Sequence, residues 1–207
     1  VPAQPADSFW SALQSVWIIL LTLQLETNGH AISLGRFDQY LWPFYKADIE
    51  QGRITRDEAL ELVEAFFVKA NEPNKLRSWP DTAFFLGYQM FESLAVGGQT
   101  ADGEDAVNDV SYLCIEACEN VKMFTPSVSV KWFSGSDDVF IERALEAVQN
   151  HEGGQPAFYN DRIFMKILRN MGIAEEDLHN RAPVGCIEAS IPGKWDFAAK
   201  GPWLNVL

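Results

Sequence analysis

A cysteine and a carboxylate two residues apart have the clearest chemical potential in this chain. Cys186 and Glu188 follow an apolar run and precede a Pro-Gly turn. If residues 182–188 form one strand, side chains at i and i+2 share a face, so both would point into one cavity. A nearby negative charge raises the pKa of a thiol and disfavours thiolate chemistry. The pair is better suited to radical chemistry, in which sulfur exchanges a hydrogen atom and the carboxylate accepts a proton.

Five tracts of the chain resemble segments of the glycyl radical enzyme family with its pyruvate formate-lyase-like domain, and they follow one another in the same order as in that family. The tract at 181–194 contains Gly-Cys-Ile-Glu and resembles the active-cysteine loop of the lyase and dehydratase branch. Five ordered tracts are far more specific than one four-residue motif, and together they cover nearly the whole chain. The other four tracts are residues 28–43, 96–106, 126–132 and 156–161.

The resemblance implies catalytic roles for both residues of the pair. A thiyl radical on Cys186 would take a hydrogen atom from a substrate carbon, and Glu188 would deprotonate the neighbouring hydroxyl. Members that cleave pyruvate have a second cysteine where this chain has Ile187. Acyl-transfer chemistry is therefore not expected for this chain. The structural alternatives are a buried thiol and an exposed loop carboxylate.

Three further positions bear on the substrate. In the family's polyol dehydratases a His-Ser pair binds substrate hydroxyls, whereas here His30 is followed by Ala31. We expect His30 to orient the substrate and Phe91 to line the pocket; the alternative for His30 is a hydrogen-bonded core residue. Lys200 stands where those dehydratases have an aspartate, which disfavours glycerol and propanediol. If Lys200 faces the pocket, it favours a carboxylate or sulfonate.

We therefore expect a glycyl radical lyase or dehydratase that eliminates a C–O, C–N or C–S bond next to a substrate hydroxyl. Hydroxyproline dehydration and hydroxysulfonate cleavage are favoured because both substrates carry an anionic group. The alternatives are a non-catalytic barrel relative that acts as a scaffold, a glycyl radical decarboxylase and a formate acetyltransferase.

The resemblance also implies what lies outside the chain. Residues 1–207 are expected to be the central fragment of one catalytic domain, without its N-terminal part and its C-terminal glycyl radical domain. No metal or organic cofactor is expected in this fragment, which should be inactive alone. A separate activating enzyme with an iron–sulfur cluster and S-adenosylmethionine would install the radical. The whole protein is expected to be a homodimer in the cytoplasm of an anaerobic bacterium, either free or within a microcompartment.

Bulk properties restrict the class of protein. With 207 residues and 47% hydrophobic composition, the chain can build a substantial core. A net charge of −13 argues against nucleic acid and anionic membranes as partners. Cys114 and Cys118 lie one helical turn apart and are expected on a buried helix face, with a metal or redox pair as the alternative. The apolar run 16–23 is too short to span a bilayer and predicts a buried helix.

Helical and strand patterns alternate along the chain, which predicts an α/β fold with a mainly parallel sheet. The resemblance specifies part of a ten-stranded α/β barrel, with the Cys186 loop projecting into its centre. Asp38, Asp102, Asp105, Asn160 and Asp161 are assigned structural roles, with Asp105 and Asp161 as helix caps. Helices are expected at 8–26, 36–51, 105–121, 137–150 and 161–171, and another is expected to begin with a capping box at residue 55. Pro43 within 36–51 is expected to be a break or an early turn. Strands are expected at 94–96, 127–133 and 182–188.

Overall fold

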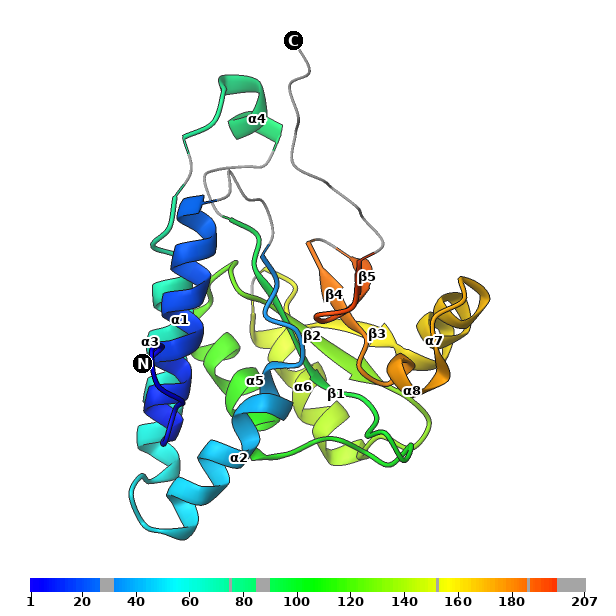
Figure 1. Ribbon diagram of the computed structural model, residues 1–207, viewed down its shortest axis with the longest axis horizontal. Helices are drawn as coiled ribbons and strands as arrows, with labels where there is room; N and C mark the ends of the chain where they lie inside the picture. Colours follow the sequence, from blue (N-terminus) through cyan, green and yellow to red (C-terminus); the bar gives the residue numbers. More distant parts are fainter. Residues whose placement is uncertain (27–31, 75, 85–89, 152, 186, 197–207) are drawn as a thin grey trace.

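The computed structural model describes residues 1–207 except 27–31, 75, 85–89, 152, 186 and 197–207. Figure 1 shows α1, α2 and α3 toward one side of the molecule, and a small hairpin together with α7 and α8 toward the other. In chain order the elements are α1 (Phe9–Glu26), α2 (Phe37–Glu50), α3 (Arg56–Ala70), α4 (Trp79–Phe84), β1 (Ser93–Gly97), α5 (Asp109–Val121), β2 (Ser127–Trp132), α6 (Asp138–Asn150), β3 (Ala157–Asn160), α7 (Asp161–Asn170), α8 (Glu175–Leu178), β4 (Ala182–Val184), β5 (Glu188–Ile191) and β6 (Trp195–Asp196).

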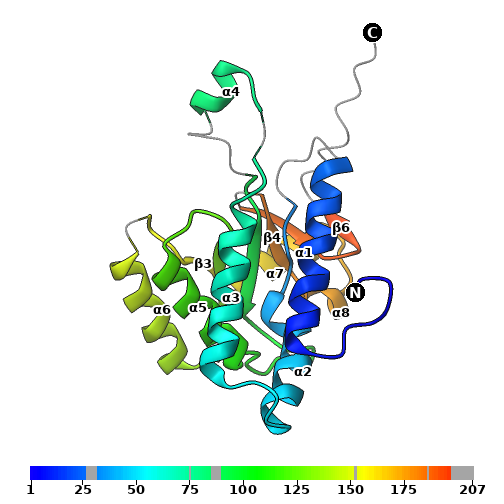
Figure 2. The ribbon, with the colours of Figure 1, turned by 90° about the vertical axis from the view of Figure 1, so that its left-hand side faces the viewer.

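The central sheet is parallel, with strand order β1-β2-β3. Helix α5 connects β1 to β2, and α6 connects β2 to β3, so each crossover returns the chain to the same end of the sheet. Helices α1, α3, α5 and α6 follow one another as successive neighbours (Figure 2). This arrangement is a segment of an α/β barrel and confirms the expected fold class.

The two faces of the sheet differ in chemistry. Leu94 and Val96 of β1, with Val128 and Val130 of β2, belong to the main apolar core that they share with the helices. Because strand side chains alternate, Ser93, Ser129 and Lys131 lie on the opposite face, where all three are buried. The β4–β5 hairpin contacts β1 and lies across the sheet from α5 and α6 (Figure 2). The sheet therefore has an apolar outer face and a polar, covered inner face.

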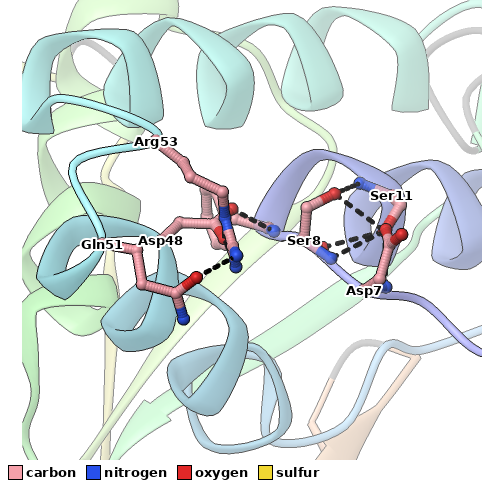
Figure 3. A network of polar contacts seen from close by, with 7 residues as sticks. Asp7, Ser8, Ser11, Asp48, Gln51 and Arg53 are labelled. Atoms are coloured by element: carbon pink, nitrogen blue, oxygen red, sulfur yellow. Dashed lines mark hydrogen bonds and ion pairs between the residues drawn. The ribbon is translucent and has the colours of Figure 1, made fainter.

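A polar network joins the start of α1 to the end of α2 (Figure 3). The side chain of Ser8 accepts from the amide of Ser11 and caps the helix, as expected. The Asp48 carboxylate accepts from the amide of Phe9 at 2.7 Å and from Nε of Arg53 at 2.7 Å. One backbone amide in the first turn of α1 thus finds its hydrogen-bond acceptor on another helix, α2.

Several local predictions are confirmed and two helix predictions are wrong. Thr55 and Glu58 form the expected capping box. Pro43 does not break α2: it lies on the exposed side, where the carbonyl left without a donor can meet water. Helix α5 begins at Asp109 with Asn108 as its cap, so Asp105 is no helix cap. The Asp105 carboxylate instead accepts from the amides of residues 107 and 137.

Helix α1 is only partly buried, contrary to expectation. Leu20 is 1% exposed, but Ile19 is 50% exposed and Leu23 is 41% exposed, because α1 packs on α2 and α3 through one side. No helix in the described part of the chain combines the length and apolar character needed to cross a bilayer.

Candidate active site

The cysteine–glutamate tract folds as a β-hairpin. Strand β4 pairs antiparallel with β5, and Val184 lies opposite Glu188. The chain reverses after Gly185, whose φ of 61° is in the left-handed region that favours glycine. The predicted single strand over 182–188 is therefore wrong, and the shared-face argument for the pair does not apply. Cys186 lies outside the described residues.

Two serine hydroxyls hold the turn of this hairpin. The amide of Gly185 donates to Oγ of Ser33 at 3.1 Å. The hydroxyl of Ser93 lies 2.8 Å from Oγ of Ser33 and 3.2 Å from the carbonyl oxygen of Pro183. Ser33 belongs to the tract 28–43, so two tracts that resemble the same family meet here. Ser33 is not among the residues predicted from the sequence, and its place in this tract was the only signal that could have identified it.

A cavity of about 190 Å³ adjoins Ser33. This volume is below the roughly 300–1,000 Å³ of typical small-molecule sites. The lining residues are Ser33, Leu34, Gly35, Pro183, Val184, Ser190, Pro192 and Gly193.

Glu188 begins β5 and is half-buried. Its Oε2 accepts a hydrogen bond from the amide of Ile187 at 3.0 Å. The carboxylate therefore folds back onto the backbone of the residue that precedes it. Its role as a base stays a prediction.

Phe91 has an unusual backbone conformation. Its φ of 59° is uncommon for a bulky aromatic residue, and such conformations concentrate at functional sites. The guanidinium carbon of Arg77 lies 5.6 Å from the centroid of its ring. The pocket-lining role of Phe91 stays a prediction, and His30 and Lys200 lie outside the described residues.

A buried carboxylic acid follows Phe91 directly. Glu92 is 0% exposed, and the side-chain amide of Gln24 donates to its Oε1 at 2.7 Å. Its Oε2 has no hydrogen-bond partner among the described residues. Burial raises the pKa of Glu92 from its ordinary 4.5 to about 7.

This raised pKa predicts a pH-dependent stability. The unfolded chain loses the Glu92 proton above pH 4.5, whereas the folded chain keeps it until about pH 7. The neutral acid therefore makes its full contribution to the free energy of unfolding below pH 4.5. This contribution, about 3 kcal/mol in total, is lost as the pH rises through 7. We expect Glu92→Gln to stabilise the protein at pH 8 and to change little at pH 4.5, as measured by denaturant melts. Glu61→Gln, at an exposed position on α3, is the control; equal effects of Glu92→Gln at both pH values would contradict the prediction.

A charged cluster lies under the base of the hairpin. Asp161 accepts from Nη2 of Arg181 at 2.8 Å, and its Oδ2 lies 3.5 Å from Nζ of Lys131. All three side chains are at most 1% exposed. Asn160, not Asp161, caps α7, so the predicted cap role of Asp161 is wrong. Asp161 instead joins α7 to β2 and to the residue that precedes β4.

Arg36 extends the same cluster. Its guanidinium donates to the carbonyls of His179 at 3.2 Å and Gly97 at 2.9 Å, and Lys131 donates to the His179 carbonyl at 2.8 Å. Burial, together with the charge of Arg36, holds the pKa of Lys131 well below its ordinary value. Asp38 is also buried and accepts from the Gly97 amide at 2.7 Å, which confirms its structural role.

The cysteines of α5 are buried, as expected: Cys114 is 0% and Cys118 is 2% exposed. Burial raises the pKa of Cys118 to about 12 and that of Cys114 well above its ordinary value. In the described part of the chain, no group of three or more His, Cys, Asp or Glu side chains is placed to hold a metal ion.

Known proteins match the chain from end to end. The family described as pyruvate formate lyase-like matches residues 1–207. A probable dehydratase (YbiW) of Escherichia coli is 36% identical over 96% of this chain, and an isethionate sulfite-lyase of Oleidesulfovibrio alaskensis is 34% identical over 99%. A trans-4-hydroxy-L-proline dehydratase of Clostridioides difficile is 33% identical over 100%. The chain spans about a quarter of the length of these relatives, at 25%, 25% and 26%.

Solved structures agree with the sequence matches. A structure that concerns 1,2-propanediol dehydration in Roseburia inulinivorans superposes with a TM-score of 0.89 at 42% identity, over 91% of this chain and 24% of its own. The glycerol-bound form of the B12-independent glycerol dehydratase from Clostridium butyricum superposes with a TM-score of 0.87 at 40% identity, over 92% of this chain and 24% of its own.

Proposed function

Because the chain belongs to the pyruvate formate lyase-like family of glycyl radical enzymes, we propose that it is part of a glycyl radical lyase or dehydratase. The observation that carries the proposal is the turn between β4 and β5, where Oε2 of Glu188 accepts from the amide of Ile187, in the tract whose sequence reads Gly-Cys-Ile-Glu. Relatives with the same overall match include named dehydratases and sulfite-lyases.

The proposed reaction uses the two residues in turn. A thiyl radical at Cys186 takes a hydrogen atom from the substrate carbon that bears a hydroxyl, which breaks C–H and forms S–H. Glu188 accepts the hydroxyl proton. The anionic radical expels the leaving group from the adjacent carbon, and Glu188 returns the proton to that group. In hydroxyproline the only hydroxyl is itself the leaving group, so the hydrogen atom would come from the carbon between it and the ring nitrogen, and Glu188 would pass the proton of that nitrogen to the departing hydroxyl, which leaves as water. The product radical then recovers a hydrogen atom from the Cys186 thiol, so atoms and electrons balance without an external oxidant.

The radical itself would come from outside this chain. In the proposal, a glycyl radical in another part of the protein, installed by an S-adenosylmethionine-dependent activating enzyme, supplies the unpaired electron to Cys186. The residues of this chain have the remaining tasks of holding the substrate, moving its proton and keeping water away from the radical.

The favoured substrates are small hydroxylated acids and sulfonates, such as hydroxyproline or a hydroxysulfonate. Two of the matching relatives carry such activities in their names, and Lys200 offers a cation where polyol dehydratases have an aspartate. Polyols are the second candidate, because the solved structures that match at 42% and 40% identity concern propanediol and glycerol.

A substrate panel tests the proposal. We expect the full-length protein, activated anaerobically, to turn over at least one of hydroxyproline, isethionate, sulfopropanediol, glycerol and 1,2-propanediol, measured by product release per glycyl radical. Anionic substrates should react fastest. Lys200→Asp should move the preference toward polyols by at least about tenfold, since one charge contact contributes about 1.4 kcal/mol or more.

The panel also separates the alternatives. A fully activated protein that consumes none of these compounds would refute the lyase proposal and favour a scaffold. Consumption of an arylacetate with release of carbon dioxide would identify a decarboxylase, and formate production from pyruvate with coenzyme A would identify an acetyltransferase.

A further inference from the structure

The turn of the reactive hairpin is fastened to a segment far away in the sequence. Gly185 donates its amide hydrogen to Oγ of Ser33 at 3.1 Å. This amide belongs to the residue directly before Cys186 in the sequence, and Glu188 lies three positions after it. A shift of the Gly185 backbone would therefore move the start of the turn that leads into β5 and Glu188.

Ser33 is itself fixed to the parallel sheet. Its neighbour Leu34 donates to the carbonyl of Ser93 at 2.7 Å, and the Ala95 amide donates to the Gly35 carbonyl at 2.8 Å. The segment therefore runs beside β1 as an added parallel bridge at Arg36 and Ala95. Because β1 is buried along its whole length, the Ser33 hydroxyl is presented by a rigid support.

Ser93 completes the arrangement from within β1. Its hydroxyl is 2.8 Å from Oγ of Ser33 and 3.2 Å from the carbonyl oxygen of Pro183, so it can donate to either. Ser93 is 2% exposed, and its hydroxyl thus orients Ser33 from the covered side. The open side of Ser33 faces the cavity of about 190 Å³.

We infer that Ser33 is a positioning residue that fixes the Gly185 end of the hairpin and thereby the place of Glu188 relative to bound substrate. The effect on catalysis rests on the proposed function. The attachment of the turn to Ser33 depends only on the hydrogen bonds described above. Ser33 is half-buried and contributes one hydroxyl rather than apolar packing, so removing the hydroxyl tests position without emptying the core.

The test compares Ser33→Ala with Ser15→Ala in the full-length, activated protein. Ser15 donates to the Ser11 carbonyl within α1, so the control removes the same atoms far from the hairpin. For Ser33→Ala we expect kcat per glycyl radical to fall about 5- to 10-fold, the effect of one lost hydrogen bond, with KM changed less than about twofold. Ser33→Thr keeps the hydroxyl and should restore most of the rate.

A second readout does not depend on turnover. Hydrogen exchange of a peptide that contains Gly185 should become several-fold faster in Ser33→Ala and stay unchanged in Ser15→Ala. Unchanged protection would overturn the inference even if the lyase proposal is right. A raised KM with an unchanged kcat would also overturn it, because Ser33 would then contact substrate. If the wild-type protein turns over nothing but Ser33→Ala still loses protection, the proposed function fails and the fastening of the turn is supported.

Discussion

Replacing Cys186 by alanine in the full-length, activated protein is expected to abolish turnover of every substrate that the wild type accepts. Alanine has no S–H bond to form or break, so the substrate hydrogen cannot be abstracted or returned. Glu188→Gln should lower kcat by about 10²- to 10⁴-fold, the usual contribution of a positioned base. Product release per glycyl radical, measured under anaerobic conditions, gives both numbers.

A matched thiol control is available on α5. Cys118 is 2% exposed and belongs to the main apolar core, so its thiol is enclosed by packing and is not presented to a substrate. Cys118→Ala should retain turnover within a few-fold at temperatures well below unfolding. A Cys186→Ala protein as active as the wild type would remove the radical mechanism and leave the scaffold alternative.

Replacing Arg181 by methionine is expected to destabilise the protein by about 3–5 kcal/mol. The change leaves the carboxylate of Asp161 buried, with Lys131 at 3.5 Å and the charge of Arg36 in the same cluster to balance it, and burial holds the pKa of that lysine well below its ordinary value. Arg181 also stacks on Phe164, with its guanidinium carbon 4.4 Å from the ring centroid; methionine keeps part of that packing but none of the charge. Chemical denaturation of the full-length protein measures the change.

The pair Arg169 and Glu175 offers the control. It joins α7 to the start of α8, but its side chains are 50% and 66% exposed, so Arg169→Met should change stability by less than about 1 kcal/mol. The double variant Asp161→Asn with Arg181→Met should recover part of the loss, because it removes the buried carboxylate that Arg181 had balanced, and the lowered pKa of Lys131 lets that side chain give up its charge when its partner is gone. A double variant with the summed loss of both singles would show that the ionic pair is not the cause.

Local signals predicted the helices well. The capping box at Thr55 and the cap at Asp137 depend on residues within one turn, so the sequence contains all the information that they need. Pro43 shows the limit of such signals. A proline costs less on an exposed helix side, and which side is exposed depends on the packing of Leu41 and Tyr45 into the core.

The hairpin and its supports depend on distant residues. Gly185 inside an apolar run was a usable sign of a turn, but nothing local shows that the turn bonds to Ser33. The role of Asp161 likewise depends on Arg181 and Lys131, which lie 20 and 30 positions away in the chain. The sequence thus predicts which residue types could do chemistry, and long-range contacts determine how the surrounding backbone is held.

The hydrogen bond from Gly185 to Ser33 also has a consequence for the order of folding. It closes a separation of 152 positions along the chain, and contacts of such range form only after the entropy of closing the intervening chain has been overcome. Strand β1 and the segment at Ser33 are synthesised long before the hairpin, so the turn docks onto a support that can already be in place. The Gly185 amide is therefore expected to become protected late in folding, and its protection is a marker that the parallel sheet beneath it is complete.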